Sequence, residues 1–318
     1  MKYSKLIGGK KRKAFSMIEL VFVMVVLGIV ASMGAEIIAQ VYSNYIRQKG
    51  LHKSSVKTEL AASIIQNRLS HRIARTTVGR NPTDNDDIVL VNQISDASTY
   101  PILEWYGVAI DSFNSNDTNG RPSWSGFCDI ADSNRSNIST PASNLSLLST
   151  IINNVSDSTI TDVALIFSGS RYSSTQRYNI DCIGYTGDRS CISTIGEIAD
   201  NTNITLSDTL PKRVHEQYSL TRSAYALIPV KTGTTDICDA ETINNPDNIC
   251  DLVLKYDYQP WTGETYQDEA TKSKVLVRNI SVFRFSGFGD NIRFKLCVKE
   301  RTGLDIEIST CKEKAVIR

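Results

Sequence analysis

Residues 8–35 of the 318-residue chain read GGKKRKAFSMIELVFVMVVLGIVASMGA, a basic run followed by a long apolar one. Between Phe15 and Ala35 the only ionisable side chain is that of Glu19. As a helix, these 21 residues would be about 31 Å long, which matches a hydrocarbon core of about 30 Å. The pattern therefore predicts one membrane-spanning helix near the start of the chain.

The cations before the apolar run predict its orientation. Residues 1–14 contain six lysines or arginines and no acid, and without these six the net charge of the chain falls from +1 to −5. Positive residues favour the cytoplasmic side of a membrane. We therefore expect a single-pass membrane protein, with its N-terminus in the cytoplasm and everything after Ala35 across the membrane.

Two simpler interpretations of this segment compete. A secretory signal peptide normally has an apolar core of about 7–15 residues and then a small-residue cleavage site. Here the apolar run is longer and continues into Glu36-Ile37-Ile38 with helical character. A plain membrane anchor explains the length and the flanking cations but not Glu19, because a carboxylate at the centre of a membrane helix costs about 2.5–3.5 kcal/mol.

Residues 13–20 read KAFSMIEL: a cation, a small residue, a phenylalanine and, four positions later, a glutamate. This order resembles the cleavage and methylation motif of type IV prepilins and type II secretion pseudopilins. The resemblance implies cleavage between Ala14 and Phe15 by a prepilin peptidase, and methylation of the new Phe15 amine. It also implies that Glu19 pairs with the N-terminal ammonium of a neighbouring subunit. The family usually has glycine where this chain has Ala14.

Glu19 also has a purely local interpretation. Ser16-Met17-Ile18-Glu19 fits the S-x-x-E pattern of a capping box in front of an apolar run. Glu19 would then cap its own helix at the level of the lipid headgroups. Pairing between subunits is also sensible, because Phe15 and Glu19 are four residues apart and share one helix face.

Helical periodicity continues beyond the membrane segment. Ile37, Val41 and Tyr45 recur at four-residue spacing, and the first proline is Pro82. We therefore predict a helix over roughly residues 15–77. Its second half carries an apolar stripe, which requires a partner surface: the head of the same chain, or neighbouring stems in a filament.

After Pro82 the pattern changes to alternating strands. The predicted fold class is α+β, a long N-terminal helix packed on an antiparallel β-sheet head with long loops, which is the plan of the pilin family. A hairpin turn is expected at residues 287–291. The predicted strands are Ile88–Ile94, Ile102–Ile110, Val163–Ser168, Ala224–Val230, Leu252–Tyr258, Val275–Ser286, Ile292–Lys299 and Leu304–Ile308. Surface loops are predicted at 112–160, 186–209 and 232–250, with a short helix at Leu145–Asn153.

These patterns divide the chain into four parts. They are a cleaved leader (1–14), a transmembrane half-helix (15–36), a periplasmic half-helix (37–78) and a β-rich head (79–318). The head is large for a major pilin, which favours a minor subunit. Residues 275–285 resemble the late strands of J-type minor pseudopilins and W-type minor pilins. The K-type pseudopilin usually lacks the glutamate that is present here as Glu19, which disfavours that type of subunit.

The seven cysteines all follow the membrane segment, in a part of the chain expected in an oxidising compartment. Pairing of sequence neighbours would leave Cys128 over, but spacing alone cannot fix the connectivity. Buried free thiols are the alternative. The neighbouring pairs are Cys182 with Cys191, Cys238 with Cys250, and Cys297 with Cys311.

Motifs for catalysis or cofactor binding are absent from the sequence. The three histidines are scattered, and no zinc, phosphate-loop or nucleophile-elbow motif occurs. Residues 115–120 begin like an EF-hand loop, but Gly126 stands where a bidentate glutamate belongs, so we expect no metal or other cofactor. Calcium in a head loop stays open as an alternative, although no motif in the sequence supports it. We expect a structural protein, not an enzyme.

The expected partners follow from the resemblance: other pilin or pseudopilin subunits, prepilin peptidase and an inner-membrane assembly platform. No direct nucleic-acid binding is predicted, and the balanced charges of the whole chain give no indication of a polyanionic partner. The alternative function is that of a single-pass membrane-anchored periplasmic binding protein or adhesin.

Overall fold

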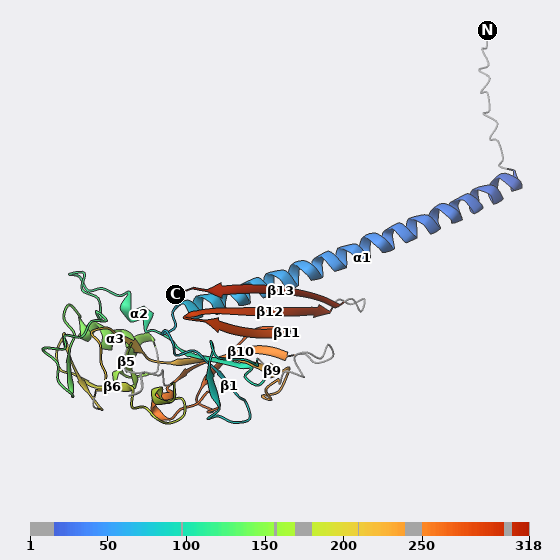
Figure 1. Ribbon diagram of the computed structural model, residues 1–318. Helices are drawn as coiled ribbons and strands as arrows, with labels where there is room; N and C mark the ends of the chain where they lie inside the picture. Colours follow the sequence, from blue (N-terminus) through green and yellow to red (C-terminus); the bar gives the residue numbers. More distant parts are fainter. Residues whose placement is uncertain are drawn as a thin grey trace, which may run out of the picture.

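The computed structural model describes residues 16–96, 98–155, 158–168, 180–208, 210–238, 250–301 and 307–317. One long helix, α1 (Met17–Ser70), extends from a β-rich head, and its second half lies along that head (Figure 1). The predicted α+β class is confirmed, with a helix packed on a large antiparallel sheet.

The helix ends at Ser70, so the predicted end near residue 77 is wrong. Beyond the helix Arg75 has a φ of 60°, in the left-handed region. The backbone N–H of Ile73 donates to the carbonyl of Tyr106 at 2.8 Å. The chain therefore leaves the helix because its next residues bond to the sheet.

An eight-stranded antiparallel sheet forms the larger part of the head, in the order β13-β12-β11-β10-β9-β3-β1-β2. The predicted hairpin is present: Phe288 pairs with Asn291, and Gly289 between them has a φ of 59°. The strands are β1 (Val78–Arg80), β2 (Ile88–Leu90), β3 (Ile102–Tyr106), β9 (Ala224–Lys231), β10 (Cys250–Tyr258), β11 (Lys272–Phe288), β12 (Asn291–Arg301) and β13 (Glu307–Val316).

Several predicted strands have different ends in the structure. The segment 88–94 is a strand only as far as Leu90, and 102–110 ends at Tyr106. The last prediction, 304–308, meets only the start of the longer β13, and its residues 304–306 lie outside the described part.

A second sheet lies in the segment between β3 and β9. The strand predicted at 163–168 is confirmed there, but the loops predicted at 112–160 and 186–209 contain three further strands, Asn137–Ser139, Ile192–Ile198 and Asn203–Leu206. Its order is β4-β7-β6-β5-β8. The three strands within the predicted loops are short, and polar residues within them gave them a loop-like composition. The strands of this sheet are β4 (Asn137–Ser139), β5 (Ala164–Phe167), β6 (Ile192–Ile198), β7 (Asn203–Leu206) and β8 (Tyr218–Thr221), with helices α2 (Ile110–Phe113) and α3 (Leu145–Val155). The predicted helix at Leu145–Asn153 is present in α3.

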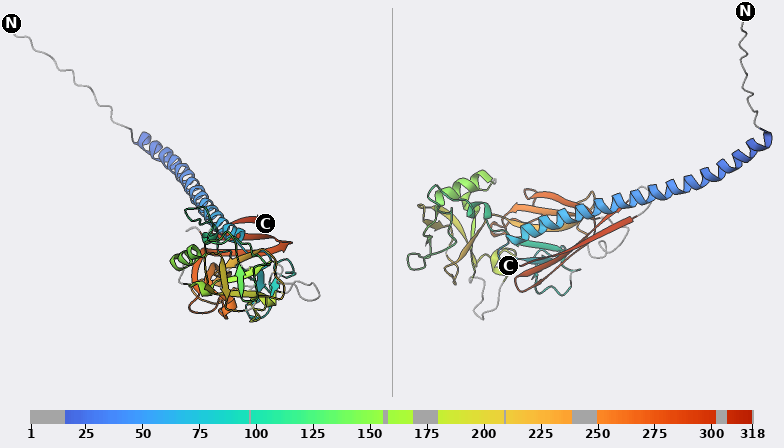
Figure 2. Two further views of the ribbon diagram at one scale, coloured as in Figure 1. Left: turned by 90° about the vertical axis from the view of Figure 1, so that its left-hand side faces the viewer. Right: turned by 90° about the horizontal axis from the view of Figure 1, so that it is seen from above.

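Three clusters of buried apolar side chains hold these layers together. In the first, α1 packs on one face of the large sheet, where Leu69 and Trp105 are fully buried. The second cluster lies on the opposite face, where the rings of Tyr106 and Trp261 meet edge to face at 5.2 Å. The third, around Phe167, lies within the segment between β3 and β9. Figure 2 shows this inserted lobe at the end of the head farthest from the N-terminus.

The structure contains three disulfides, as the composition led us to expect. They join Cys182 to Cys191, Cys238 to Cys250, and Cys297 to Cys311, and Cys128 is a buried free thiol. These are the pairs of sequence neighbours.

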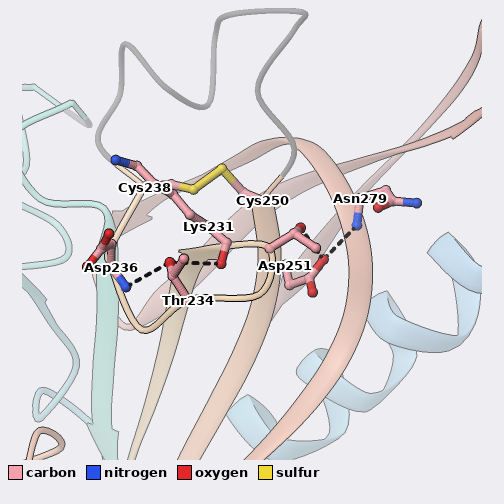
Figure 3. Close-up of a disulfide and its surroundings, with 8 residues drawn as sticks. Lys231, Thr234, Asp236, Cys238, Cys250, Asp251 and Asn279 are labelled. Carbon is pink, nitrogen blue, oxygen red and sulfur yellow. Dashed lines mark hydrogen bonds between the residues drawn. A yellow bond between two sulfur atoms is a disulfide. The ribbon is translucent and has the colours of Figure 1, made fainter.

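One of these disulfides ties the start of β10 to the segment after β9. Figure 3 shows Cys238 and Cys250 beside a turn in which Thr234 Oγ1 donates to the carbonyl of Lys231 at 3.2 Å. Asp251, next to Cys250, accepts a hydrogen bond from the backbone N–H of Asn279 on β11 at 3.1 Å. Residues 239–249, within the predicted loop 232–250, lie outside the described part.

Alkylation should count the disulfides. We expect the denatured, unreduced chain to take up one alkyl group, at Cys128, and seven after reduction, by intact mass. The folded chain should react more slowly, because burial raises the pKa of the Cys128 thiol. Uptake of three or more groups by unreduced protein purified from an oxidising compartment would contradict the pairing.

Candidate assembly site

The first turn of α1 is capped by Ser16. Its Oγ accepts a hydrogen bond from the backbone N–H of Glu19 at 3.3 Å, and its ψ of 149° is that of an extended N-cap residue. Glu19 therefore occupies the third helical position, where a carboxylate is stabilised by the positive end of the helix dipole. One half of the capping box predicted as an alternative role for Glu19 is thus present.

The reciprocal half of the capping box is not formed. Within the described part of the chain, the Glu19 carboxylate accepts no hydrogen bond and makes no ion pair, and the residue is exposed. The helix is therefore capped by Ser16, while the carboxylate stays exposed and without a partner among the described residues. Ala14 and Phe15, the predicted processing residues, lie outside the described residues.

The first half of α1 is exposed on every side. It contains an 18-residue window with a mean hydropathy of 2.4, none of it buried in the head. Phe22 is 70% exposed and Val30 62% exposed. A helix that is apolar all round is stable in lipid or among other apolar helices, not in water. This segment is compatible with single-pass membrane anchoring.

The second half of α1 is buried along one stripe. Small side chains dominate this stripe and let the helix approach β12 and β13 closely. Ser54 Oγ donates to the carbonyl of Val298 on β12 at 3.1 Å, and Thr58 Oγ1 donates to the carbonyl of Ser54 at 2.7 Å. The buried residues are Gly50, Ser54, Thr58, Ala61, Ala62, Ile65 and Leu69.

The sequence analysis did not identify the small polar residues of this stripe. The available signal was the recurrence of Gly50, Ser54 and Thr58 at four-residue spacing. This spacing keeps small residues on one helix face, where a sheet can approach.

Two carboxylates on either side of the contact fix α1 to the last two strands. Glu300 on β12 forms ion pairs with Lys53, at 3.1 Å, and with Lys57. Glu59 on α1 forms ion pairs with two lysines of β13, Lys314 at 2.6 Å and Lys312 at 3.3 Å. Each carboxylate is thus shared by two cations across the helix–sheet boundary.

These contacts lower the pKa of both carboxyl groups. For Glu300, burial acts to raise the pKa, but the hydrogen bonds from Lys57 and Lys53 outweigh it. For Glu59, the hydrogen bonds from Lys314 and then Lys312 lower the pKa. A carboxyl pKa lowered by folding stabilises the fold above the unfolded pKa and loses this contribution as the pH falls through the folded pKa. The docked helix should therefore loosen in acid.

Acidic residues in the loops of the head bond to groups of their own loops. Asp117, in the EF-hand-like segment, accepts hydrogen bonds from the backbone N–H groups of Asn119 and Arg121, both at 2.8 Å. Asp87 accepts one from the hydroxyl of Tyr100 at 3.0 Å. Among the residues that the structure describes, no three His, Cys, Asp or Glu side chains are grouped to hold a metal ion.

Substitution of Glu300 tests whether the ion pairs of this docking contact stabilise the fold more than an exposed surface ion pair does. We expect Glu300→Gln to lower the free energy of unfolding at pH 7 by about 1–2 kcal/mol. As the pH falls from about 5 to below 4, the Glu300→Gln variant should also lose less stability than the unsubstituted chain does. The measurement is urea unfolding of the detergent-solubilised chain, followed by near-UV circular dichroism. Glu313→Gln is the matched control, because Glu313 is 55% exposed and pairs with Arg293 within the sheet. Equal effects of the two substitutions would contradict the docking role.

Comparison with known proteins identifies the N-terminal segment. A family model of the prokaryotic N-terminal methylation motif matches residues 9–35, which include Ala14, Phe15 and Glu19. Neither the curated proteins nor the solved structures that were compared with the chain gave a match. The chain thus carries the prokaryotic N-terminal methylation motif leading directly into the apolar α1, a combination that is consistent with the type IV pilin and pseudopilin family.

Proposed function

We propose that this chain is a structural minor subunit of a type IV pilus or a type II secretion pseudopilus, assembled through α1. The observation that carries the proposal is the continuity of the motif at residues 9–35 with an exposed apolar helix that is long enough to cross a membrane. The same helix continues into the head without a break. A force on the helix, or an axial position fixed in the membrane, would therefore be transmitted directly to the head.

The proposed route begins with insertion of the precursor, its leader (1–14) in the cytoplasm. Prepilin peptidase cuts between Ala14 and Phe15, and the new Phe15 amine is methylated. Residues 15–36 then cross the inner membrane, while 37–78 and the head (79–318) lie in the periplasm. The assembly platform transfers the subunit into a filament of other pilin or pseudopilin subunits.

Glu19 would guide this transfer. Its carboxylate is exposed and has no partner within the described part of its own chain. In lipid an unpaired carboxylate is costly, so a cation from a neighbouring subunit would be strongly favoured. The Phe15 ammonium of that neighbour supplies such a cation, and the pair would fix the axial register of the two helices.

The proposal of a minor subunit rests on the size of the head. A lobe with its own apolar cluster is inserted between β3 and β9, and a filament repeating this head at every position would have to accommodate each copy. A place at or near the tip, where few copies are needed and assembly begins, suits such a head.

Processing is the first test. We expect the membrane-extracted protein to lose residues 1–14 and gain one methyl group, by intact mass, only when the prepilin peptidase is present. A full-length mass, or a cut after the apolar segment, would rule out assembly and leave a membrane-anchored binding protein or adhesin, or a secreted one.

The role of Glu19 can be tested separately from processing. We expect Glu19→Gln to leave cleavage intact but to reduce recovery of the subunit in sheared filaments or crosslinked subunit pairs by about tenfold or more, as for loss of a charge-assisted bond. Glu36→Gln is the matched control, since Glu36 is the next acid on the same exposed helix. Similar recovery of the two variants would contradict pairing through Glu19.

A further inference from the structure

A cavity of about 540 Å³ lies between the end of α1 and the inserted lobe. Figure 1 shows α2 near the end of α1, on the side of this lobe. The volume falls within the range of about 300–1,000 Å³ that is usual for small-molecule sites. The lining residues come from five stretches of the chain, within 70–74, 108–113, 124–127, 166–168 and 217–219.

Aromatic residues form part of the cavity wall. Phe113, Trp124, Phe127 and Tyr218 all line it. The ring centroids of Phe113 and Trp124 are 4.8 Å apart, and those of Trp124 and Tyr218 are 5.8 Å apart. Phe113 is 40% exposed and Phe127 39% exposed, so both leave apolar surface in water. A ligand with an apolar face would cover this surface, which is favourable.

Hydrogen bonds fix this aromatic wall before any ligand arrives. Nε1 of Trp124 donates to Oγ of Ser112 at 3.0 Å. The hydroxyl of Tyr218 shares a hydrogen bond with Oγ1 of Thr140 at 2.7 Å. The backbone N–H of Tyr218 donates to the carbonyl of Gly126 at 3.0 Å, which joins the two stretches that carry these rings. A preformed site loses less entropy when a ligand binds.

Neutral polar side chains also line the cavity. Ser168 and Ser219 supply hydroxyl groups, and Gln217 supplies an amide. Within the described part of the chain, these three side chains make no hydrogen bond to another residue. Together they offer several donors and acceptors to a ligand. A ligand that bonds to them would displace water and break no bond of the fold.

The lining carries no fixed charge. Among the described residues that line the cavity there is no aspartate, glutamate, lysine or arginine. A charged ligand would lose part of its hydration here and would gain no opposite charge. A purely apolar ligand would leave the lining hydroxyl and amide groups without a partner. The lining therefore favours a neutral ligand with one apolar face and several hydroxyl or amide groups.

We propose that this cavity binds a neutral sugar unit of an oligosaccharide. One face of a sugar ring consists of C–H groups, and the faces of aromatic rings such as Phe113 and Phe127 attract such partly positive groups. The hydroxyl groups at the edge of the sugar can bond to Gln217 and Ser219. The site does not depend on processing or on assembly through α1, so its test is independent of the proposed function.

Fluorescence anisotropy tests the site on the full-length chain, in a detergent whose headgroup is not a sugar. The labelled probes are chitotriose and maltotriose, which are neutral, the acidic trigalacturonic acid, and the neutral peptide Gly-Ser-Gly-Ala-Leu as an amide. We expect at least one neutral trisaccharide to bind at least tenfold more tightly than the acidic one and the peptide. Which of the two binds more tightly shows whether an acetamido group contributes.

Variants then assign the binding to this cavity. Phe127→Ala and Gln217→Ala should each weaken binding about fivefold, by loss of ring contact and of a hydrogen bond. Phe127→Tyr retains the ring and should stay within about twofold. Phe288→Ala is the matched control, because Phe288 is 87% exposed and does not line the cavity. It should also stay within about twofold.

Two results would overturn the proposal. One is that neither neutral trisaccharide binds more tightly than trigalacturonic acid and the peptide. The other is that Phe127→Ala and Gln217→Ala both bind as well as the unsubstituted chain, or that Phe288→Ala loses as much affinity as they do. Because Phe127 and Gln217 are exposed, both variants should keep the melting temperature of the unsubstituted chain. A loss of binding in them therefore cannot be attributed to unfolding.

Discussion

The α1 helix has to meet two different solvents along its length, and the arrangement of the head follows from that constraint. Its first half is apolar on every side and exposed, which is stable only in lipid or among other helices. Its second half buries one narrow stripe of small residues against β12 and β13, with lysine–carboxylate pairs on both sides. The small residues set how close the sheet lies, and the ion pairs fix its rotation about the helix.

Covering one face of a large sheet with a helix leaves the other face to be covered by something else. Here the segment between β3 and β9 does this, and its Ile183 and Tyr185 lie in the same apolar cluster as Tyr106 and Trp261. The insertion is therefore part of the head's stability and also extends beyond it, as a lobe with its own cluster around Phe167. Surface could therefore be added at the end of the head farthest from the N-terminus without altering α1.

The features that were predictable from the sequence are those with a strong local period. The apolar run, the alternation in Ile292–Lys299 and the glycine-rich turn at 287–291 each reflect the geometry of one element. The prediction failed where tertiary contacts decide. Strands such as Asn203–Leu206 are short and half polar, and the helix ends at Ser70 because later residues bond to a strand more than thirty positions away. The cavity beyond the end of α1 was invisible for the same reason, since its walls come from five separate stretches.

The same few residues after α1 end the helix and build one wall of that cavity. Ile73 and Ala74 line it because the chain leaves helical geometry at His71 and then turns through a left-handed residue. From Glu19 to Ser70 a continuous helix spans roughly 75 Å, so contacts made in the membrane and contacts made at the cavity cannot touch. They can be coupled only if the helix moves as one body with the head. The ion pairs of Glu59 and Glu300 provide that attachment, which makes the docked stripe the part of the molecule on which any such coupling would depend.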